Sequence, residues 1–251
     1  MANRIPMIAG NWKMHKTAAE AAESAKKLAA LTADVSGREI MIAPTFTALD
    51  AVSRALAGST ILLGAQNMYW EDKGAYTGEI APGMLLAAGC QCVLVGHSER
   101  RQYFGETDET VNKKLHAALA HELIAVVCVG ETEAQREAGE TFSVLDKQIK
   151  IGLKGVFQQR PDLLIVAYEP VWAIGTGKTA TTDQAQEAHH YIRSLLEQEF
   201  GGDFASAIRI LYGGSVKPAN IAELMSMPDI DGGLVGGASL EAETFSDIVH
   251  Y

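Results

Sequence analysis

Short apolar runs recur along the chain, and each is followed by a longer segment in which apolar and polar positions alternate with helical spacing. The runs carry few polar residues, so both of their faces are apolar, which is typical of strands buried in a parallel sheet. We predict strands at Pro6–Ala9, Glu39–Ala43, Thr60–Ala65, Cys92–Val95, Ile124–Val129, Leu163–Ala167, Ile208–Tyr212 and Gly233–Val235.

The segments between these runs predict amphipathic helices. Thr17–Leu31 is rich in Ala, Glu and Lys and places apolar residues on one face, and Thr107–His121 repeats this pattern. A third helix is predicted to begin at Thr181, because Thr181-x-x-Gln184 is a capping box that satisfies backbone N–H groups at a helix start.

Strict alternation of eight strands and eight helices predicts an all-parallel α/β sheet. Eight such units in 251 residues match the usual size of a (β/α)8 TIM barrel, with an outer ring of helices. No Pro/Ser-rich linker or shift in composition divides the chain, so we expect a single domain over residues 1–251. An open, doubly wound sheet is the alternative architecture.

The composition and net charge of the chain limit the classes of partner that it is expected to bind. The chain is 47% hydrophobic and 21% charged, and no stretch approaches the roughly 20 apolar residues of a membrane span. A net charge of −10 argues against nucleic acid or an anionic membrane as a partner. Three cysteines without C-x-x-C spacing favour a reduced, cytoplasmic protein, and the absence of an H-E-x-x-H pattern gives no support for a metal site.

One carboxylate stands at the end of a predicted buried strand. Glu169 follows the run Leu163–Ala167 almost directly, and Pro170 restricts it to extended backbone. Next comes a loop that mixes large apolar residues with small ones, Val171-Trp172-Ala173-Ile174-Gly175-Thr176-Gly177. A solitary strand-end glutamate is more often a solvated charge, but apolar residues in a loop favour a lid that closes over a base.

Three segments partly match known sequence motifs, but the residues in or around each of them do not fit the motif. Residues 175–180 fit the dinucleotide pattern G-x-G-x-x-A, but six residues separate them from the strand that should precede them directly. The phosphate-binding P-loop would need glycine where Trp172 stands. Gly96-His97-Ser98-Glu99-Arg100 resembles the hydrolase elbow, but Arg100 is too bulky for its second glycine position, so Ser98 is not predicted to be a nucleophile.

Polar residues also follow the other predicted strands, and barrels place their active sites at the carboxyl ends of the strands. These residues are Asn11-Trp12-Lys13, His97-Ser98-Glu99, Gly213-Gly214-Ser215 and Gly236-Gly237. Barrels often bind phosphate with backbone N–H groups after strands seven and eight. The paired glycines and Ser215 therefore predict an anion site built from uncovered amides and a hydroxyl.

Together these groups suit one reaction. A carboxylate such as Glu169 can take a proton from a carbon beside a carbonyl if preorganised donors meet the developing enolate oxygen. Lys13, Asn11 and His97 are suitable donors, and a neutral histidine is best matched to shuttle a proton between neighbouring oxygens. The sequence therefore predicts proton transfer on a phosphorylated hydroxy-carbonyl compound, under a lid that excludes water.

The segment Gln66–Gly83 does not fit a simple strand–helix unit. It is long, lacks periodicity and carries Tyr69, Trp70 and Tyr76. Long loops without secondary structure are usually functional, and exposed aromatic residues favour contact with another subunit. We expect this loop to form an interface between copies of the chain, and it does not distinguish a dimer from a tetramer.

Five motifs resemble those of the triosephosphate isomerase family and occur in the same order between Ala9 and Leu240. They are Asn11-Trp12-Lys13, His97-Ser98-Glu99-Arg100, Tyr168-Glu169-Pro170-Val171-Trp172-Ala173-Ile174-Gly175-Thr176-Gly177, Tyr212-Gly213-Gly214-Ser215-Val216 and Val235-Gly236-Gly237-Ala238-Ser239-Leu240. The resemblance implies interconversion of dihydroxyacetone phosphate and D-glyceraldehyde 3-phosphate in glycolysis and gluconeogenesis, without a cofactor or metal. Loop closure over the substrate is a well-known feature of this family.

The resemblance also implies residue roles. Glu169 would be the general base, His97 the neutral electrophile, and Lys13 the charge that stabilises the enediolate, with Asn11 as a supporting donor and Glu99 orienting Lys13. Further residues would bind the substrate through the strand-one motif or through its phosphate, namely Trp12, Gly175, Ser215, Gly236 and Gly237. The loop Gln66–Gly83 would form a homodimer, with Thr77 reaching the partner near its Asn11.

Two other functions remain open. Lys13 could form a Schiff base with a carbonyl substrate, as in an aldolase. The barrel could also be a non-catalytic scaffold, because a fold does not by itself establish a function. Loss of Glu169, His97 or Lys13 would indicate the scaffold, and all three are present.

Overall fold

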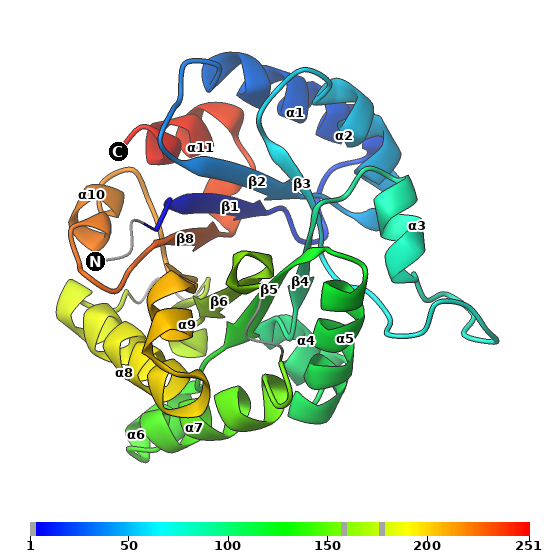
Figure 1. Cartoon of the computed structure of the whole chain (residues 1–251). Coiled ribbons are helices and arrows are strands. Elements are labelled where there is room, and N and C mark those ends of the chain that lie inside the picture. Colours follow the sequence, from blue (N-terminus) through cyan, green and yellow to red (C-terminus); the bar gives the residue numbers. More distant parts are fainter. Residues whose placement is uncertain (1–3, 157–159, 176–178) are drawn as a thin grey trace.

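The chain folds into a closed barrel of parallel strands surrounded by helices (Figure 1). The computed structural model describes residues 4–156, 160–175 and 179–251. Strands follow one another in sequence order around the barrel, and the last closes it by pairing with the first, with Ala9 opposite Leu234. The predicted TIM barrel is confirmed, and the doubly wound alternative is wrong because an open sheet has two unpaired edges.

Most strands have the predicted bounds to within two residues. The strands are β1 (Met7–Asn11), β2 (Glu39–Ala43), β3 (Leu62–Ala65), β4 (Cys92–Val95), β5 (Ile124–Val129), β6 (Leu164–Tyr168), β7 (Arg209–Tyr212) and β8 (Gly232–Val235). The main difference is β1, which continues through Asn11, because the backbone of that residue pairs with Ala43 of β2. Asn11 therefore belongs to the barrel wall.

Helices follow each strand, but the alternation is less strict than predicted. The helices are α1 (Ala18–Leu31), α2 (Leu49–Ala55), α3 (Pro82–Ala87), α4 (Ser98–Tyr103), α5 (Asp108–Ala120), α6 (Glu133–Glu137), α7 (Thr141–Gly152), α8 (Thr182–Phe200), α9 (Gly202–Ala207), α10 (Ile221–Met225) and α11 (Ala242–Val249). The short helices α4, α6 and α9 add to the one helix per strand. The three helix starts read from the sequence are confirmed, because Thr17, Thr107 and Thr181 each cap the following helix.

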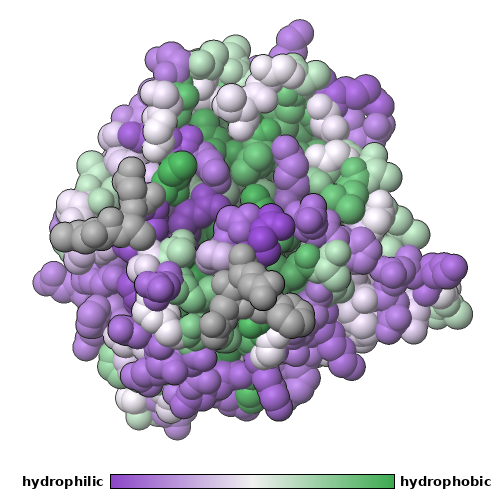
Figure 2. Space-filling view, viewed as in Figure 1, coloured by the Kyte–Doolittle hydropathy of each residue, from purple (hydrophilic) through white to green (hydrophobic). Residues whose placement is uncertain are grey.

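The core has two layers, because successive strand residues point to opposite sides of the barrel wall. Inside the barrel lie Met7, Ala9, Met41, Ala43, Cys92, Leu94, Val126, Cys128, Ile165, Ala167, Leu211 and Leu234. The intervening residues, such as Ile8, Val93 and Val127, pack outward against the helices. On the face shown in Figure 2, hydrophilic side chains cover much of the rim, and hydrophobic ones show mainly in recesses between them.

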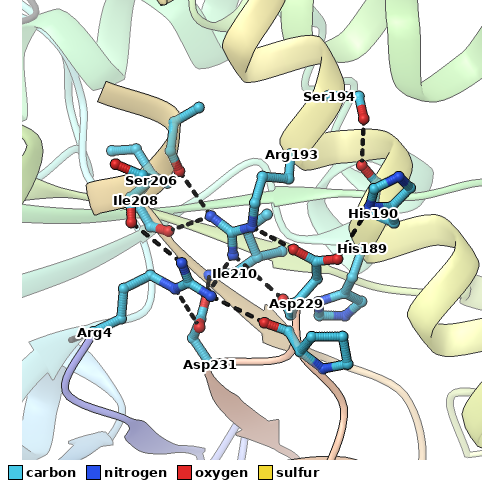
Figure 3. Close-up of polar contacts among 12 residues, drawn as sticks. Arg4, His189, His190, Arg193, Ser194, Ser206, Ile208, Ile210, Asp229 and Asp231 are labelled. Carbon is cyan, nitrogen blue, oxygen red and sulfur yellow. Dashed lines mark hydrogen bonds and ion pairs between the residues drawn. The ribbon is translucent and has the colours of Figure 1, made fainter. Parts of the chain in front are cut away.

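A buried cluster of charges joins α8 to the start of β7 and β8 (Figure 3). Arg193 donates from Nε to Asp229 Oδ1 at 2.7 Å and from Nη2 to Asp231 Oδ2 at 2.6 Å. Asp231 also accepts from Arg4 Nε at 2.5 Å and from the N–H of Ile210 at 2.8 Å. Arg193 thus bonds both carboxylates and holds α8 against the barrel.

We expect Arg193→Met to lower the free energy of unfolding by about 3–5 kcal/mol, because it leaves the buried Asp229 and Asp231 without their shared cation. Chemical denaturation measures this change. Lys150→Met removes the exposed ion pair with Asp146 and should cost less than about 1 kcal/mol. Equal losses in the two variants would contradict the importance of the Arg193 cluster.

The loop between β3 and α3 projects from the barrel (Figure 1). It begins at Gln66 as predicted, but it ends at Ala81 rather than Gly83, because α3 starts at Pro82. Residues 71–79 are all exposed, whereas Tyr69 stacks on Trp70 with ring centroids 4.0 Å apart. The loop is therefore an ordered projection with aromatic side chains at its base. Among the described helices, none has the length and hydrophobicity to cross a membrane.

Candidate active site

A cavity of about 230 Å³ opens at the carboxyl ends of the strands. Its wall combines the polar residues that follow β1, β4, β6, β7 and β8 with residues of the loop after β6. The lining residues are Asn11, Lys13, His97, Glu169, Ala173, Ile174, Gly175, Gly213, Gly214, Ser215, Val216, Lys217, Leu234, Gly236, Gly237 and Ala238. Five segments that are far apart in the sequence therefore meet around one small volume.

Glu169 is the most buried charge in this cavity, with 2% of its surface exposed. Its backbone is packed so closely that its neighbours must be glycines: a Cβ on Gly130 would lie 1.9 Å from the carbonyl oxygen of Glu169. A Cβ on Gly213 would lie 2.8 Å from its Cγ. Gly213, predicted to bind an anion, thus makes room for the glutamate, and its N–H donates to the carbonyl of Tyr168 at 2.7 Å.

The Glu169 carboxylate is held by two groups from the β4–α4 connection. The N–H of Ser98 donates to Oε2 at 2.9 Å, and Nε2 of His97 lies 3.0 Å from Oε1. Burial alone would raise the pKa of Glu169, but the His97 ring, the Ser98 N–H and Lys13 together lower it below its ordinary value. The carboxylate is therefore ionised.

His97 faces Glu169 with one ring nitrogen and the start of α4 with the other. Burial lowers the pKa of His97, whereas the carboxylates of Glu169 and Glu99 raise it, with an increase as the net result. The N–H of Glu99 donates to Nδ1 at 3.3 Å, and we therefore assign the ring proton of neutral His97 to Nε2. Nε2 points into the cavity region as a hydrogen-bond donor.

Lys13 brings a positive charge to the same wall. Its Nζ lies 2.6 Å from Oε1 of Glu99, which fixes the direction of the ammonium group. Its backbone has a φ of +52°, a left-handed conformation that is uncommon for residues other than glycine. The side-chain oxygen of Asn11 stabilises this turn by accepting from the N–H of Lys13 at 3.0 Å. Asn11 thus positions the backbone of Lys13, and Glu99 positions its ammonium group.

The part of the wall next to the Lys13 side chain offers backbone N–H groups, since a Cβ on Gly236 would lie 3.4 Å from Cε of Lys13. After β8 the chain forms the short 3-10 turn η4 (Gly237–Ser239), whose first hydrogen bonds run from Ser239 to Gly236 and from Leu240 to Gly237. This pattern leaves the N–H groups of Gly237 and Ala238 at the free end of the turn, where anions bind favourably. Ser215, after β7, lines the same wall. Free N–H groups and a hydroxyl are the donors that an anionic group such as a phosphate needs, and we call this part of the wall the anion cradle.

The site therefore holds an ionised carboxylate, a donor histidine and an ammonium group beside an anion cradle. Residues 6–251 match the family described as Triosephosphate isomerase. The chain belongs to the triosephosphate isomerase family.

Individual relatives agree with this assignment over almost the whole chain. The chain is 57% identical to a triosephosphate isomerase of Citrifermentans bemidjiense over 248 residues, covering 99% of each protein. It is 58% identical to that of Moorella thermoacetica, again covering 99% of each. The crystal structure of triosephosphate isomerase from Bartonella henselae superposes with a TM-score of 0.90, at 40% identity, and covers 98% of this chain and 99% of that one.

The loop after β6 is anchored in a way that the sequence motif of the family did not reveal. Glu131 is fully buried and accepts from Trp172 Nε1 at 2.9 Å and from the hydroxyl of Tyr168 at 3.1 Å. These bonds hold the 3-10 turn η3 (Val171–Ala173). Gly175 has a φ of +69°, which favours glycine, and lines the cavity. The rest of the predicted lid, Thr176, Gly177 and Lys178, lies outside the described residues.

Gln66, the first residue of the long loop, is a further site residue that the sequence pattern did not identify. Its Nε2 donates to the carbonyl oxygen of Lys13 at 2.7 Å and to that of Ala43 at 2.9 Å. It therefore holds the carbonyl group of Lys13, whereas Asn11 holds the N–H group of the same residue. Neither its position nor its residue type distinguishes it from an ordinary loop glutamine.

We expect Gln66→Met to lower kcat/KM by about 3–10-fold, because the hydrogen bonds to the carbonyl oxygens of Lys13 and Ala43, worth about 1 kcal/mol each, no longer tie the Lys13 turn to β2. Steady-state kinetics measure this loss. Gln198→Met, on the exposed face of α8, is the matched control and should leave kcat/KM unchanged. Unchanged kinetics in Gln66→Met would show that Asn11 suffices to position Lys13.

Three predicted residues do not line the cavity, and of these Glu99 reaches the site through its contact with Lys13. Trp12 is 1% exposed and packs in the layer between strands and helices, so its side chain lies away from the cavity lining. Thr77 lies in the exposed part of the projecting loop. Among the described residues, no group of three or more His, Cys, Asp and Glu side chains is arranged to hold a metal ion.

Proposed function

We propose that this member of the triosephosphate isomerase family interconverts dihydroxyacetone phosphate and D-glyceraldehyde 3-phosphate, with Glu169 as the general base. The single observation that carries this proposal is the buried, ionised Glu169 carboxylate on the wall of a cavity that also contains His97, Lys13 and a cradle of N–H groups. The reaction is an intramolecular isomerisation, so it needs no co-substrate.

The chemistry follows from these groups. Bound in the cradle by its phosphate, dihydroxyacetone phosphate presents C1 to Glu169, which removes a proton and leaves an enediolate. His97 donates from Nε2 to the carbonyl oxygen, and then moves a proton between the two oxygens. Glu169 returns its proton to C2, which gives glyceraldehyde 3-phosphate. No atom is lost or gained, and the carboxylate ends as it began.

Lys13 and Asn11 support the charged intermediate. The ammonium group of Lys13 stabilises negative charge on the enediolate oxygen and on the phosphate, because charge–charge attraction is strong in a site shielded from water. Glu99 fixes its direction through the 2.6 Å contact. The phosphate is bound by the N–H groups of Gly175 and Gly237, with further contacts from Ser215 and Gly236.

Glu169 must move before it can act, because its oxygens are engaged by Ser98 and His97 rather than directed to a substrate. Once the carboxylate leaves, His97 loses the contact that most raises its pKa, while its burial remains. The ring is then neutral and serves as a donor. We infer that closure of the loop after β6 accompanies this movement, since Glu169 and Val171 belong to the same connection.

Incubation with dihydroxyacetone phosphate in heavy water tests the function directly. The proton on Glu169 exchanges with solvent during the enediolate stage, so deuterium should appear on carbon in recovered substrate and product. Nuclear magnetic resonance detects it. Absence of carbon-bound deuterium would rule out the proposed base mechanism.

The aldolase alternative requires Nζ of Lys13 to attack a carbonyl carbon, whereas this nitrogen donates to Oε1 of Glu99 at 2.6 Å. Borohydride added with dihydroxyacetone phosphate should therefore trap no adduct on Lys13, and intact-protein mass spectrometry would detect one. The scaffold alternative predicts no isomerisation at all, so the heavy-water experiment separates it from the proposed function.

We propose further that the chain is a homodimer through the loop Gln66–Gly83, with Thr77 near Asn11 of the partner. Large apolar side chains support this, because several are exposed in or near the loop and on α3 and α4: Tyr76 at 42%, Met84 at 54%, Tyr103 at 74% and Phe104 at 68%. Light scattering should give twice the chain mass of 26.9 kDa. A mass of one chain, or of four, would contradict the dimer.

A cytoplasmic location is part of the same proposal. Cys90, Cys92 and Cys128 are free and buried, as expected of a protein that folds where thiols stay reduced. Fractionation of the source cells, followed by immunodetection, tests the location.

A further inference from the structure

A second cavity, of about 250 Å³, shares Glu169 with the substrate cavity. It lies among the connections that follow β4, β5 and β6. Its lining residues are Gly96, Ser98, Arg101, Gln102, Cys128, Val129, Gly130, Thr132, Gln135, Gln148, Glu169 and Val171. We propose that this cavity is a regulatory site for a small, uncharged carboxamide, and that its occupation holds Glu169 in the withdrawn position.

The charges on the wall are matched within the protein, which argues against a charged ligand. Arg101 donates to Asp108 at 2.6 Å and to the carbonyl oxygens of Gly96 and Cys128 at 2.8 and 3.2 Å. Glu169 is paired with His97. An ionic ligand would enter without a counter-charge and would lose its hydration, at a high cost in free energy.

Carboxamide groups supply most of the remaining polar lining. Gln102 is exposed on α4, at the rim of the cavity. Gln135 uses its oxygen for Thr132, which leaves its amide nitrogen to donate. Gln148 also lines the cavity, but its side chain bonds the N–H and the carbonyl of Gly130, so Gln102 and Gln135 are the carboxamides that face a ligand. A carboxamide ligand has the complementary donor and acceptor for such groups.

Size and apolar contacts define the rest of the ligand. Val129 and Val171 contribute hydrocarbon to the wall, so a ring attached to the carboxamide has surfaces to pack against. The volume lies below the roughly 300–1,000 Å³ of sites for drug-sized molecules, so a molecule of fragment size fits. Benzamide combines these properties and serves as the probe.

The wall of this second cavity includes Glu169 and Val171, which move in the proposed catalytic cycle. The N–H of Ser98 holds the withdrawn carboxylate, and Val171 begins the turn η3 that anchors the loop after β6. A ligand that packs against Glu169, Ser98 and Val171 in this arrangement stabilises it relative to the catalytic one. By mass action, the fraction of enzyme with an advanced Glu169 then falls. This consequence rests on the proposed role of Glu169.

Saturation-transfer nuclear magnetic resonance on the full-length protein measures benzamide binding without reference to activity. We expect saturable binding that weakens when 2-phosphoglycolate, a mimic of the enediolate, is present. Coupling between sites typically changes affinity about 5–150-fold, so saturating benzamide should weaken the binding of 2-phosphoglycolate by about fivefold or more, and it should also lower kcat. Because the phosphate cradle stays accessible, excess substrate should not restore the rate.

The variant Gln102→Ala removes one carboxamide from the rim and should weaken benzamide binding while its kinetics without benzamide remain normal. Gln198→Ala, on the exposed face of α8, is the matched control and should bind benzamide normally. No saturable binding, equal binding by both variants, or inhibition that excess substrate reverses would overturn the proposed site. Failure of the proposed role of Glu169 would be recognised separately, as normal turnover by Glu169→Gln, and failure of the proposed function as absence of turnover by the original protein.

Discussion

Glu169→Gln should lower kcat by at least about 10²–10⁴-fold, the usual contribution of a positioned general base. The amide has the same shape as the carboxylate, and its oxygen can still accept from the N–H of Ser98, so the fold is retained. It cannot remove a proton from carbon. Substrate binding depends on the phosphate cradle, which this change leaves intact, so KM should change much less than kcat.

Initial-rate measurements in both directions test this expectation, and thermal unfolding confirms that the variant is folded. Glu199→Gln makes the same chemical change on the exposed surface of α8 and should have normal kinetics. Carbon–deuterium exchange should disappear together with turnover in Glu169→Gln. A kcat within about tenfold of the original would mean that another group removes the proton, and the mechanism proposed above would be wrong.

The barrel could be predicted because buried parallel strands are apolar on both faces. Glu39–Ala43, Cys92–Val95 and Ile124–Val129 match β2, β4 and β5 at both ends. Strand ends were harder to predict where side chains carry no information. Asn11 is polar, but its backbone pairs with Ala43, and Gly232 opens β8 without any side chain to mark it. Hydrogen bonding between strands, rather than hydrophobicity, sets those boundaries.

Residues of the candidate site were predictable where they directly follow a strand. The barrel geometry alone brings Lys13, His97 and Glu169 to one end, so position along the chain was enough to group them. Residues that act through long-range backbone contacts were not predictable in this way. Gln66 bonds the carbonyl oxygen of Lys13, 53 positions earlier in the chain, and nothing in its local sequence indicates that contact.

Hydrogen bonds made by main-chain N–H groups are a second feature of the site that the sequence does not predict. The sequence motif around Ser98 concerns its hydroxyl group, whereas in the structure it is the N–H of this residue that holds Glu169. Gly213 was expected to offer its N–H to an anion, but it bonds Tyr168 and leaves space for Glu169. Residue type does not reveal what a main-chain amide binds, because all residues except proline carry the same group.

Lys13→Met should lower kcat/KM by at least about 10²–10³-fold, the cost of losing one preorganised group that stabilises an oxyanion. Methionine nearly matches the length of lysine and is unbranched at Cβ, so the left-handed turn at this position is strained no further. Both kinetic constants should change, because the ammonium group stabilises the enediolate and also attracts the substrate phosphate. Loss of the charge also leaves Glu99 without the ammonium group that it contacts.

Lys217→Met is the charge-matched control for the Lys13→Met variant. Lys217 is exposed and lines the same cavity, so its replacement changes the net charge there by the same amount. If the enzyme only needed a positive field to attract an anion, the two variants would lose similar activity, and raised ionic strength would reduce the difference from the original enzyme. We expect Lys217→Met to lose only a few-fold in kcat/KM, because none of the side chains in the described parts of the chain fixes its ammonium group as Glu99 fixes that of Lys13. Similar losses in both variants would refute a specific role for Lys13 in stabilising the enediolate.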